Sequence, residues 1–179
     1  MSKSFCNKKK VFNKIKKLNV RSGEKMYHIK DKEFIRGKVP MTKEEIRAVS
    51  IAKMEISDED VCIDIGGGTG SVSIEMARFA KNGHVYTIEQ KEEAVDLIKQ
   101  NMEKFEIKNM TVISGKAPED LPQGITFDKV FIGGSGGNLS EIINYSYENL
   151  KEALDGEVIS GIYPKGEITS NLKEVSELE

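Results

Sequence analysis

The sequence predicts an α/β fold in which a parallel β-sheet is covered by helices on both faces. Short apolar runs alternate with amphipathic helical segments, the first strand ends in a glycine-rich loop, and the next strand ends in a glutamate. This alternation is typical of parallel sheets with crossover helices. The 179 residues suit one domain, and 38% hydrophobic against 31% charged residues permit a buried core.

The predicted elements begin with a helix at residues 42–54. Thr42 and Glu45 have the spacing of a capping box, in which the threonine caps the helix and the glutamate reaches back to it. The next three elements are a buried strand that ends in glycines, a helix with apolar residues on one face and a second apolar strand, at residues 61–65, 71–80 and 85–88.

The second half of the chain repeats the same alternation. Asn138 and Glu141 have capping-box spacing again, so we expect a side-chain cap at the start of that helix. Amphipathic spacing predicts helices at residues 91–103, 138–150 and 168–178. Apolar runs predict strands at residues 110–113, 129–132 and 157–160.

Charge divides the chain into a basic arm, residues 1–32, and a body, residues 33–179. Residues 1–38 carry 11 Lys and 2 Arg against 3 acidic residues, a net charge of +10, while the remaining residues carry −12. Val11, Ile15 and Leu18 have the spacing of one helical face, so we expect the arm to be partly helical. A solvated helix that packs on the body is favoured over one that binds a membrane, nucleic acid or an acidic partner.

Composition also bears on location and on metals. The arm lacks the apolar core and cleavage site of a secretory signal, and no run of about 18 apolar residues could span a membrane, so we expect a cytoplasmic protein. The two cysteines and two histidines form no cluster with metal-ligand spacing, so we expect no metal site.

The sharpest local signal is the loop that follows Asp64, between a predicted strand and a predicted helix. Glycines there let the backbone turn tightly and approach a ligand closely. Glu89 ends the next strand, 19 residues after the last glycine, where a carboxylate can accept both hydroxyls of a ribose. The spacing of the glycines differs from that of an NAD pyrophosphate loop, and no P-loop occurs. The cofactor-binding candidates in the loop are Gly66, Gly67, Gly68, Thr69 and Gly70.

Residues 61–70 resemble motif I of class I methyltransferases that use S-adenosylmethionine. The resemblance implies a Rossmann-like class I methyltransferase fold. It also implies that the glycine loop passes the methionine moiety, that Glu89 holds the ribose, and that Asp64 orders the loop.

A second glycine loop, residues 131–137, narrows the family. It lacks the N-P-P-Y or D-P-P-Y motif of the adenine, cytosine and glutamine N-methyltransferases. Together with residues 39–47 and the Gly-Lys-Ala-Pro-Glu segment at 115–119, it resembles the CbiT family over roughly residues 33–160. Members of that family are cobalt-precorrin-6B C15-methyltransferases (decarboxylating) of cobalamin biosynthesis, related to the C-terminal half of precorrin-6Y C5,15-methyltransferase.

The resemblance implies a tetrapyrrole substrate, methylated at C15 with loss of CO2 from the C12 acetate, and cofactor contacts from Thr42 and Ala117. The sequence departs from the pattern of that family at Lys116, where an aspartate is usual. We expect the N–H groups of residues 133–137 to form a nest for a substrate carboxylate or developing negative charge. The predicted catalytic residues of this loop are Gly134, Ser135 and Gly136, and the predicted anchors for substrate carboxylates are Arg36, Lys38 and Lys43.

Two other functions remain open at this point. A tRNA or protein methyltransferase could use the basic arm to bind its substrate, although nucleic acid is the less favoured partner. A truncated, non-catalytic module that binds S-adenosylmethionine is suggested by the C-terminus, because the methyltransferase fold usually has two more strands and the chain stops at Glu179. We expect a homo-oligomer in either case.

Overall fold

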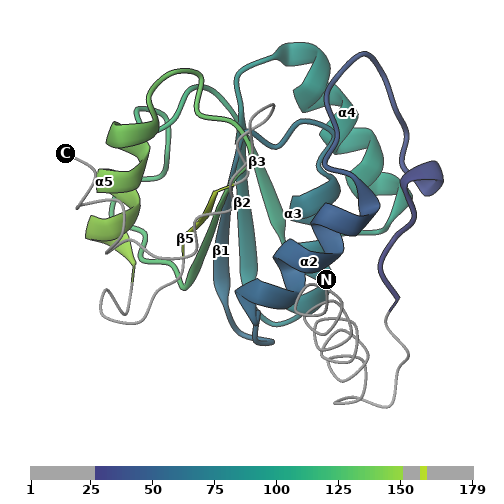
Figure 1. Ribbon diagram of the computed structural model, residues 1–179, viewed down its shortest axis with the longest axis horizontal. Coiled ribbons are helices and arrows are strands. Elements are labelled where there is room, and N and C mark those ends of the chain that lie inside the picture. Colours follow the sequence, from purple (N-terminus) through teal and green to yellow (C-terminus); the bar gives the residue numbers. More distant parts are fainter. Residues whose placement is uncertain (1–26, 151–157, 161–179) are drawn as a thin grey trace, which may run out of the picture.

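A computed structural model describes residues 27–150 and 158–160 (Figure 1). The predicted arm helix at Val11, Ile15 and Leu18 and the predicted last helix at residues 168–178 lie outside the described residues. Within the described residues, no helix is long and apolar enough to cross a membrane.

The centre of the fold is a five-stranded parallel sheet with the order β3-β2-β1-β4-β5. Its strands are β1 Val61–Ile65, β2 His84–Glu89, β3 Met110–Ser114, β4 Lys129–Ile132 and β5 Val158–Ser160. Each lies within one residue of a predicted strand at either end, so the strand predictions are confirmed. The chain passes outward from β1 to β3 and returns to the other side of β1 with β4, which makes the boundary between β1 and β4 a topological switch point.

Helices cover both faces of the sheet, as predicted. One face carries α2 Glu44–Met54, α3 Ser71–Phe79 and α4 Glu92–Lys104, and the other carries α5 Leu139–Asn149 (Figure 1). A short 3-10 helix, η1 Asp31–Glu33, precedes α2. The structure therefore has the Rossmann-like arrangement that the sequence implied.

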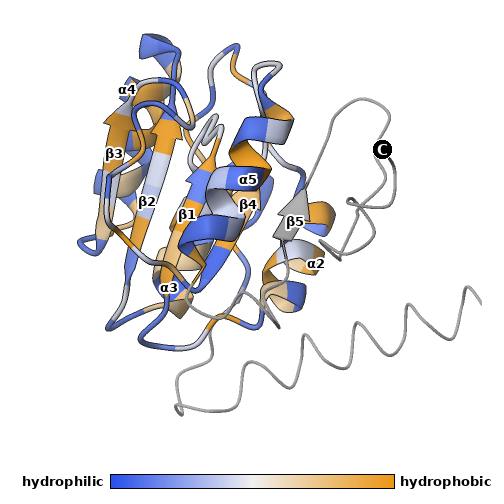
Figure 2. Cartoon of the chain, turned by 90° about the vertical axis from the view of Figure 1, so that its left-hand side faces the viewer, coloured by the Kyte–Doolittle hydropathy of each residue, from blue (hydrophilic) through white to orange (hydrophobic). Residues whose placement is uncertain are grey.

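Alternation of side chains along the strands produces two buried clusters. On β4, Phe131 points to the α2–α3–α4 face, whereas Val130 and Ile132 belong to the cluster beneath α5. On β1, Cys62 joins the first cluster and Ile63 the second. Figure 2 shows hydrophobic residues concentrated in the strands. Both faces of the sheet are buried, which is why the strands are continuous apolar runs and not alternating ones.

The two predicted side-chain caps are wrong. Helix α2 begins one residue later than expected, with Lys43 and not Thr42 as its N-cap. The Thr42 carbonyl instead accepts a hydrogen bond of 2.6 Å from the Arg47 guanidinium. Asn138 is the N-cap of α5, but its side chain makes no cap. Its backbone has φ −104° and ψ 35°, which differs from the extended conformation that caps normally adopt.

A buried ion pair fastens the segment before α2 to the rest of the fold. Arg47 and Glu75 are both fully buried, and the Arg47 Nε atom donates to Glu75 Oε1 at 3.0 Å. Arg47 Nη1 also donates to Asp31 Oδ1 at 3.1 Å, and Nη2 donates to the Ile29 carbonyl. A guanidinium has five donors in a fixed plane, so one side chain can hold several elements at once.

Glu75 completes this network from α3. Its Oε1 atom also accepts the Ile29 N–H at 3.0 Å, and its Oε2 atom lies 2.6 Å from His28 Nδ1. Ile29 is 6% exposed and packs in the first core cluster. Residues 28–31, which the sequence assigned to the basic arm, therefore pack with the body.

We predict that Glu75→Gln lowers the free energy of unfolding by about 3 kcal/mol, because it leaves the Arg47 charge buried without its main carboxylate. Glu119→Gln is the control: it breaks an exposed ion pair, Lys116 Nζ to Glu119 Oε1 at 3.4 Å, and should cost less than about 1 kcal/mol. Equilibrium unfolding in urea measures both values. Equal losses in the two variants would show that the buried network adds no more than a surface pair.

Candidate functional site

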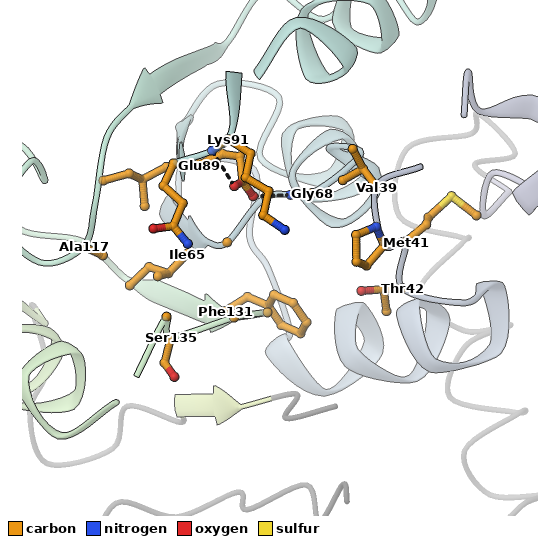
Figure 3. A pocket seen from close by; sticks show the side chains of 18 of the residues that line it. Val39, Met41, Thr42, Ile65, Gly68, Glu89, Lys91, Ala117, Phe131 and Ser135 are labelled. Atoms are coloured by element: carbon orange, nitrogen blue, oxygen red, sulfur yellow. Dashed lines mark hydrogen bonds between the residues drawn. The ribbon is translucent and has the colours of Figure 1, made fainter. Parts of the chain in front are cut away.

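A cavity of about 870 Å3 lies at the carboxyl ends of β1, β2 and β4 (Figure 3). This is the switch point of the sheet, where open α/β folds bind ligands. Its volume is within the range of small-molecule sites, about 300–1,000 Å3. The first loop (residues 66–70) and the second loop (residues 133–137) meet there, and the segment at residues 39–43 forms a further wall.

The first loop lies in close contact with two other backbone segments, one at Gly134 and one at Pro40. Gly66 and Gly68 have φ values of +78° and +56°, a region that glycine adopts readily. A Cβ on Gly66 would lie 2.7 Å from the Gly134 nitrogen, and one on Gly68 would lie 2.8 Å from the Pro40 carbonyl oxygen. Glycine is therefore required at both positions by the close approach of the neighbouring backbone as well as by conformation.

The first three N–H groups of this loop already have acceptors within the protein. Gly66 and Gly67 both donate to the Ile88 carbonyl, at 2.9 and 3.2 Å, and Gly68 donates to Glu89 Oε2 at 3.0 Å. A phosphate cradle needs such N–H groups to point at the ligand. The geometry of these three residues therefore favours a ligand that lies against the loop over an anion held by it.

Glu89 is held firmly at the edge of the cavity. Its Oε2 atom accepts the Gly68 N–H, and its Oε1 atom accepts the Lys91 N–H at 3.0 Å (Figure 3). The side chain is 8% exposed and lines the cavity. Each carboxylate oxygen can accept more than one hydrogen bond, so acceptor capacity remains for a ligand hydroxyl.

Thr69 and Gly70 do not line the cavity, unlike Gly66, Gly67 and Gly68. The Thr69 carbonyl accepts a hydrogen bond of 3.0 Å from the Asn101 side chain on α4. Gly70 has φ +77°, and a Cβ there would lie 3.1 Å from Ile98. These two predicted contacts occupy the junction with α3, behind the residues that face the cavity.

Asp64 lies beneath the first loop in a buried polar chain. The Ser73 hydroxyl donates to Asp64 Oδ2 and lies 3.1 Å from Thr87 Oγ1, while Asp64 Oδ1 has no hydrogen-bond partner among the described residues. Burial raises the pKa of Asp64 to about 7 from its ordinary 3.8; the Ser73 hydrogen bonds oppose this shift and the Glu89 charge adds to it. A Cβ on Gly67 would lie 2.4 Å from Thr87 Oγ1. The buried polar side chains of Asp64, Ser73 and Thr87 therefore lie directly beneath the first loop.

The second loop only partly fits the predicted N–H nest. Gly133 and Gly134 both donate their N–H groups to the Ile65 carbonyl, at 2.8 and 3.2 Å, so these two donors are wrongly predicted to be open to a substrate. They extend the β4–β1 ladder beyond the end of the strand. In the described part of the chain, the N–H groups of Ser135, Gly136 and Gly137 donate to no protein acceptor. The cavity is lined by Gly134, Ser135 and Gly136.

The remaining walls bring together residues that are far apart in sequence. Thr42 lines the cavity, and Figure 3 shows the ring of Phe131 directed from β4 toward it. Met41 and Ile46 add apolar surface on the same side, and Ile46 is 39% exposed. Ala117, 7% exposed, lines the opposite side. Thr42 and Ala117 are thus placed at the same cavity as Glu89 and the first loop.

Sequence reasoning missed the polar residues that hold the site together. Asn101 accepts the Ile35 N–H at 2.8 Å while its amide donates to the Ile35 and Thr69 carbonyls, so it joins the segment before α2 to the first loop. Its position, seven residues after Ala94 on the apolar face of α4, was the available signal. Arg47 also lies on an apolar helix face, because it is four residues before the buried Ile51 in α2.

Comparisons with known proteins identify relatives of this chain. Residues 33–158 match the model of a family described as "Precorrin methyltransferase domain". A relative from Methanocaldococcus jannaschii, named "Probable cobalt-precorrin-6B C(15)-methyltransferase (decarboxylating)", is 47% identical over 118 residues, covering 65% of this chain and 62% of the relative. A relative of the same name from Sulfurisphaera tokodaii is 45% identical over 126 residues, covering 69% of this chain and 65% of the relative. The chain thus spans less than two thirds of the length of these two relatives.

Solved structures agree with these relatives. A precorrin-6y C5,15-methyltransferase from Geobacter metallireducens superimposes with a TM-score of 0.71 at 36% identity, covering 83% of this chain and 74% of that one. A protein described as precorrin 8w decarboxylase from Methanobacterium thermoautotrophicum gives a TM-score of 0.69 at 32% identity, covering 83% and 76%.

The buried carboxyl of Asp64 predicts a particular dependence of stability on pH. Between pH about 4 and 7 the folded state keeps a proton that the unfolded state releases, so the stability that Asp64 contributes at low pH is lost as the pH rises to about 7. Asp64→Asn cannot titrate. Relative to wild type, its free energy of unfolding should therefore rise with pH, by on the order of 4 kcal/mol between pH about 4 and 7.

Urea unfolding of both proteins at several pH values measures that difference. Ser73→Ala provides the comparison, because it removes the hydrogen bond to the carboxylate but leaves the titrating group. Parallel profiles for wild type and Asp64→Asn would show that Asp64 titrates with an ordinary pKa.

Proposed function

The chain belongs to the precorrin methyltransferase domain family, and on that premise we propose that it methylates C15 of cobalt-precorrin-6B with loss of CO2 from the C12 acetate. The proposed methyl donor is S-adenosylmethionine. The observation that carries the proposal is the meeting of Glu89 with both glycine loops in one cavity at the switch point of the sheet. The names of the relatives supply the identity of the substrate.

The residues at the inner end of the cavity fit S-adenosylmethionine. Glu89 would accept ribose hydroxyls with its remaining lone pairs, and Gly66, Gly67 and Gly68 would allow the ligand to lie against the backbone. Ala117 and Thr42 would line the same ligand from opposite sides. The bound cofactor would supply a methyl group bonded to a positively charged sulfonium sulfur, and the neutral thioether that remains after transfer is a good leaving group.

With such a donor, the task of the protein is to position the reacting carbon and to exclude water. The apolar surface of Met41, Ile46 and Phe131 would lie against the flat macrocycle. Ser135 and Gly136 line the cavity and retain N–H groups that could donate to a substrate carboxylate or to developing negative charge. Gly133 and Gly134 serve instead to fix the loop on Ile65.

Mass spectrometry of a reaction with cobalt-precorrin-6B and S-adenosylmethionine tests the proposal. The product should have gained CH2 and lost CO2. Methylation of tRNA or protein instead would replace the proposed substrate. Binding of the cofactor without any turnover would indicate a non-catalytic module.

Glu89→Gln should weaken S-adenosylmethionine binding about tenfold or more, because it removes charge-assisted hydrogen bonds of about 1.5–3 kcal/mol each. Calorimetric titration measures the affinity. Glu103→Gln, an exposed glutamate on α4, is the control and should bind as wild type does. Unchanged affinity in folded Glu89→Gln would place the ribose elsewhere.

Gly134→Ala should reduce turnover more than cofactor affinity. A Cβ on Gly134 meets no atom within 4 Å, so the fold should accept it, yet it projects where the second loop lines the cavity. Gly136→Ala should cost more stability because Gly136 has φ +57°. Separate measurements of cofactor affinity, methyl transfer and CO2 release distinguish the roles. Wild-type turnover in Gly134→Ala would remove the second loop from the substrate site.

A further inference from the structure

Positive charge dominates the rim of the cavity. Among the residues that the structure describes, the lining includes one carboxylate, Glu89, which already accepts two backbone N–H groups. The cations that line the cavity are Arg36, Lys43, Lys91 and Lys116. They come from separate parts of the chain, so the excess of positive charge is a property of the folded cavity and not of one basic run.

Two of these cations already have carboxylate partners. Lys43 Nζ lies 3.9 Å from Asp31 Oδ2, and Lys116 Nζ lies 3.4 Å from Glu119 Oε1. For Arg36 and Lys91, no ion pair or side-chain hydrogen bond is found within the part of the chain that the structure describes. Both are exposed at the rim, where a ligand can reach them.

Arg36 and Lys91 belong to one side of the cavity. Ile35 and Val39, which lie just before and three residues after Arg36, pack against Ala94 and Leu97 of α4. Lys91 is the N-cap of the same helix. A Cβ on Gly37 would lie 3.4 Å from Glu93 Oε1, which confirms how close this segment is to the first turn of α4. Glu92 and Glu93 are exposed acids of that turn, but neither lines the cavity. The two cations therefore face a ligand in the cavity across a shared rim.

We propose that Arg36 and Lys91 determine specificity by each binding a carboxylate on the periphery of the substrate. This inference rests on the proposed function, which makes the substrate a tetrapyrrole with several carboxylates. Arg36 can bind a carboxylate through two parallel N–H groups, and Lys91 acts as a flexible point charge. Neither residue has to give up an ion pair with another described residue in order to do so.

Porphyrin binding tests this role without the native substrate. Uroporphyrin I carries an acetate and a propionate on every ring, while coproporphyrin I carries only propionates, so both are flat polycarboxylates that differ in charge. Quenching of porphyrin fluorescence measures affinity in the full chain. We expect wild type to bind uroporphyrin more tightly, with a preference that weakens as salt rises, because exposed charges are screened over about 8–10 Å.

The variants Arg36→Gln and Lys91→Gln should each weaken uroporphyrin binding about two- to fivefold, and the double variant about tenfold. The sequence also suggested Lys38 as an anchor, but the structure does not place it in the lining of the cavity. Lys38→Gln is therefore the matched control, because Lys38 is an exposed cation two residues from Arg36. This control should change the affinity less than twofold.

Equal losses in Arg36→Gln, Lys91→Gln and Lys38→Gln would overturn the proposal, because net charge alone would then explain the binding. Failure of wild type to bind either porphyrin would overturn it as well. Calorimetric titration with S-adenosylmethionine is run on the same proteins and reports separately on the proposed function. Wild type that binds uroporphyrin through these two residues but not the cofactor would retain the carboxylate site and refute the methyltransferase assignment.

Discussion

The site depends on the buried ion pair between Arg47 and Glu75. The ends of the strands and the loops that follow β1, β2, β3 and β4 supply most of the cavity lining, but one wall is irregular backbone at residues 39–43 with no sheet ladder to hold it. Arg47 fixes that backbone through the Thr42 carbonyl and is itself fixed by Glu75 on α3. Burying two charges has a desolvation cost that this pair offsets with further hydrogen bonds to Ile29 and Asp31. The network thus holds the segment at residues 39–43 in place, although this segment belongs to no helix or strand.

The hydrogen bonds of the first loop show why its glycines are needed. Because Gly66, Gly67 and Gly68 donate to Ile88 and Glu89, the first loop presents a surface without free N–H groups at those positions. The glycines are needed for close approach, to Gly134 on one side and to Pro40 on the other. The Gly68 and Lys91 N–H groups orient the Glu89 carboxylate before any ligand arrives, so little reorganisation is required on binding.

The sequence was sufficient to predict the strands, the helices on both faces, and the positions of Glu89 and the glycine loops at one edge of the sheet. Those features follow from hydrophobic periodicity and from the rule that parallel strands end at the same edge. The sequence did not correctly predict how helix α2 begins, because the capping-box spacing of Thr42 and Glu45 cannot reveal that the Arg47 guanidinium binds the Thr42 carbonyl. The expected nest at Gly133 and Gly134 was wrong because their donors continue the ladder to β1. Asn101, Arg47 and Glu75 act through partners distant in sequence, which local patterns do not encode.

Contact between the two loops has a thermodynamic consequence. The Gly66 backbone lies so close to Gly134 that neither loop can be displaced far without moving the other. A ligand that shifted the first loop would therefore change the free energy of the second, and the binding of the proposed cofactor and the proposed substrate would be linked. Linkage is reciprocal, so whatever factor one ligand imposes on the affinity of the other is returned in equal measure.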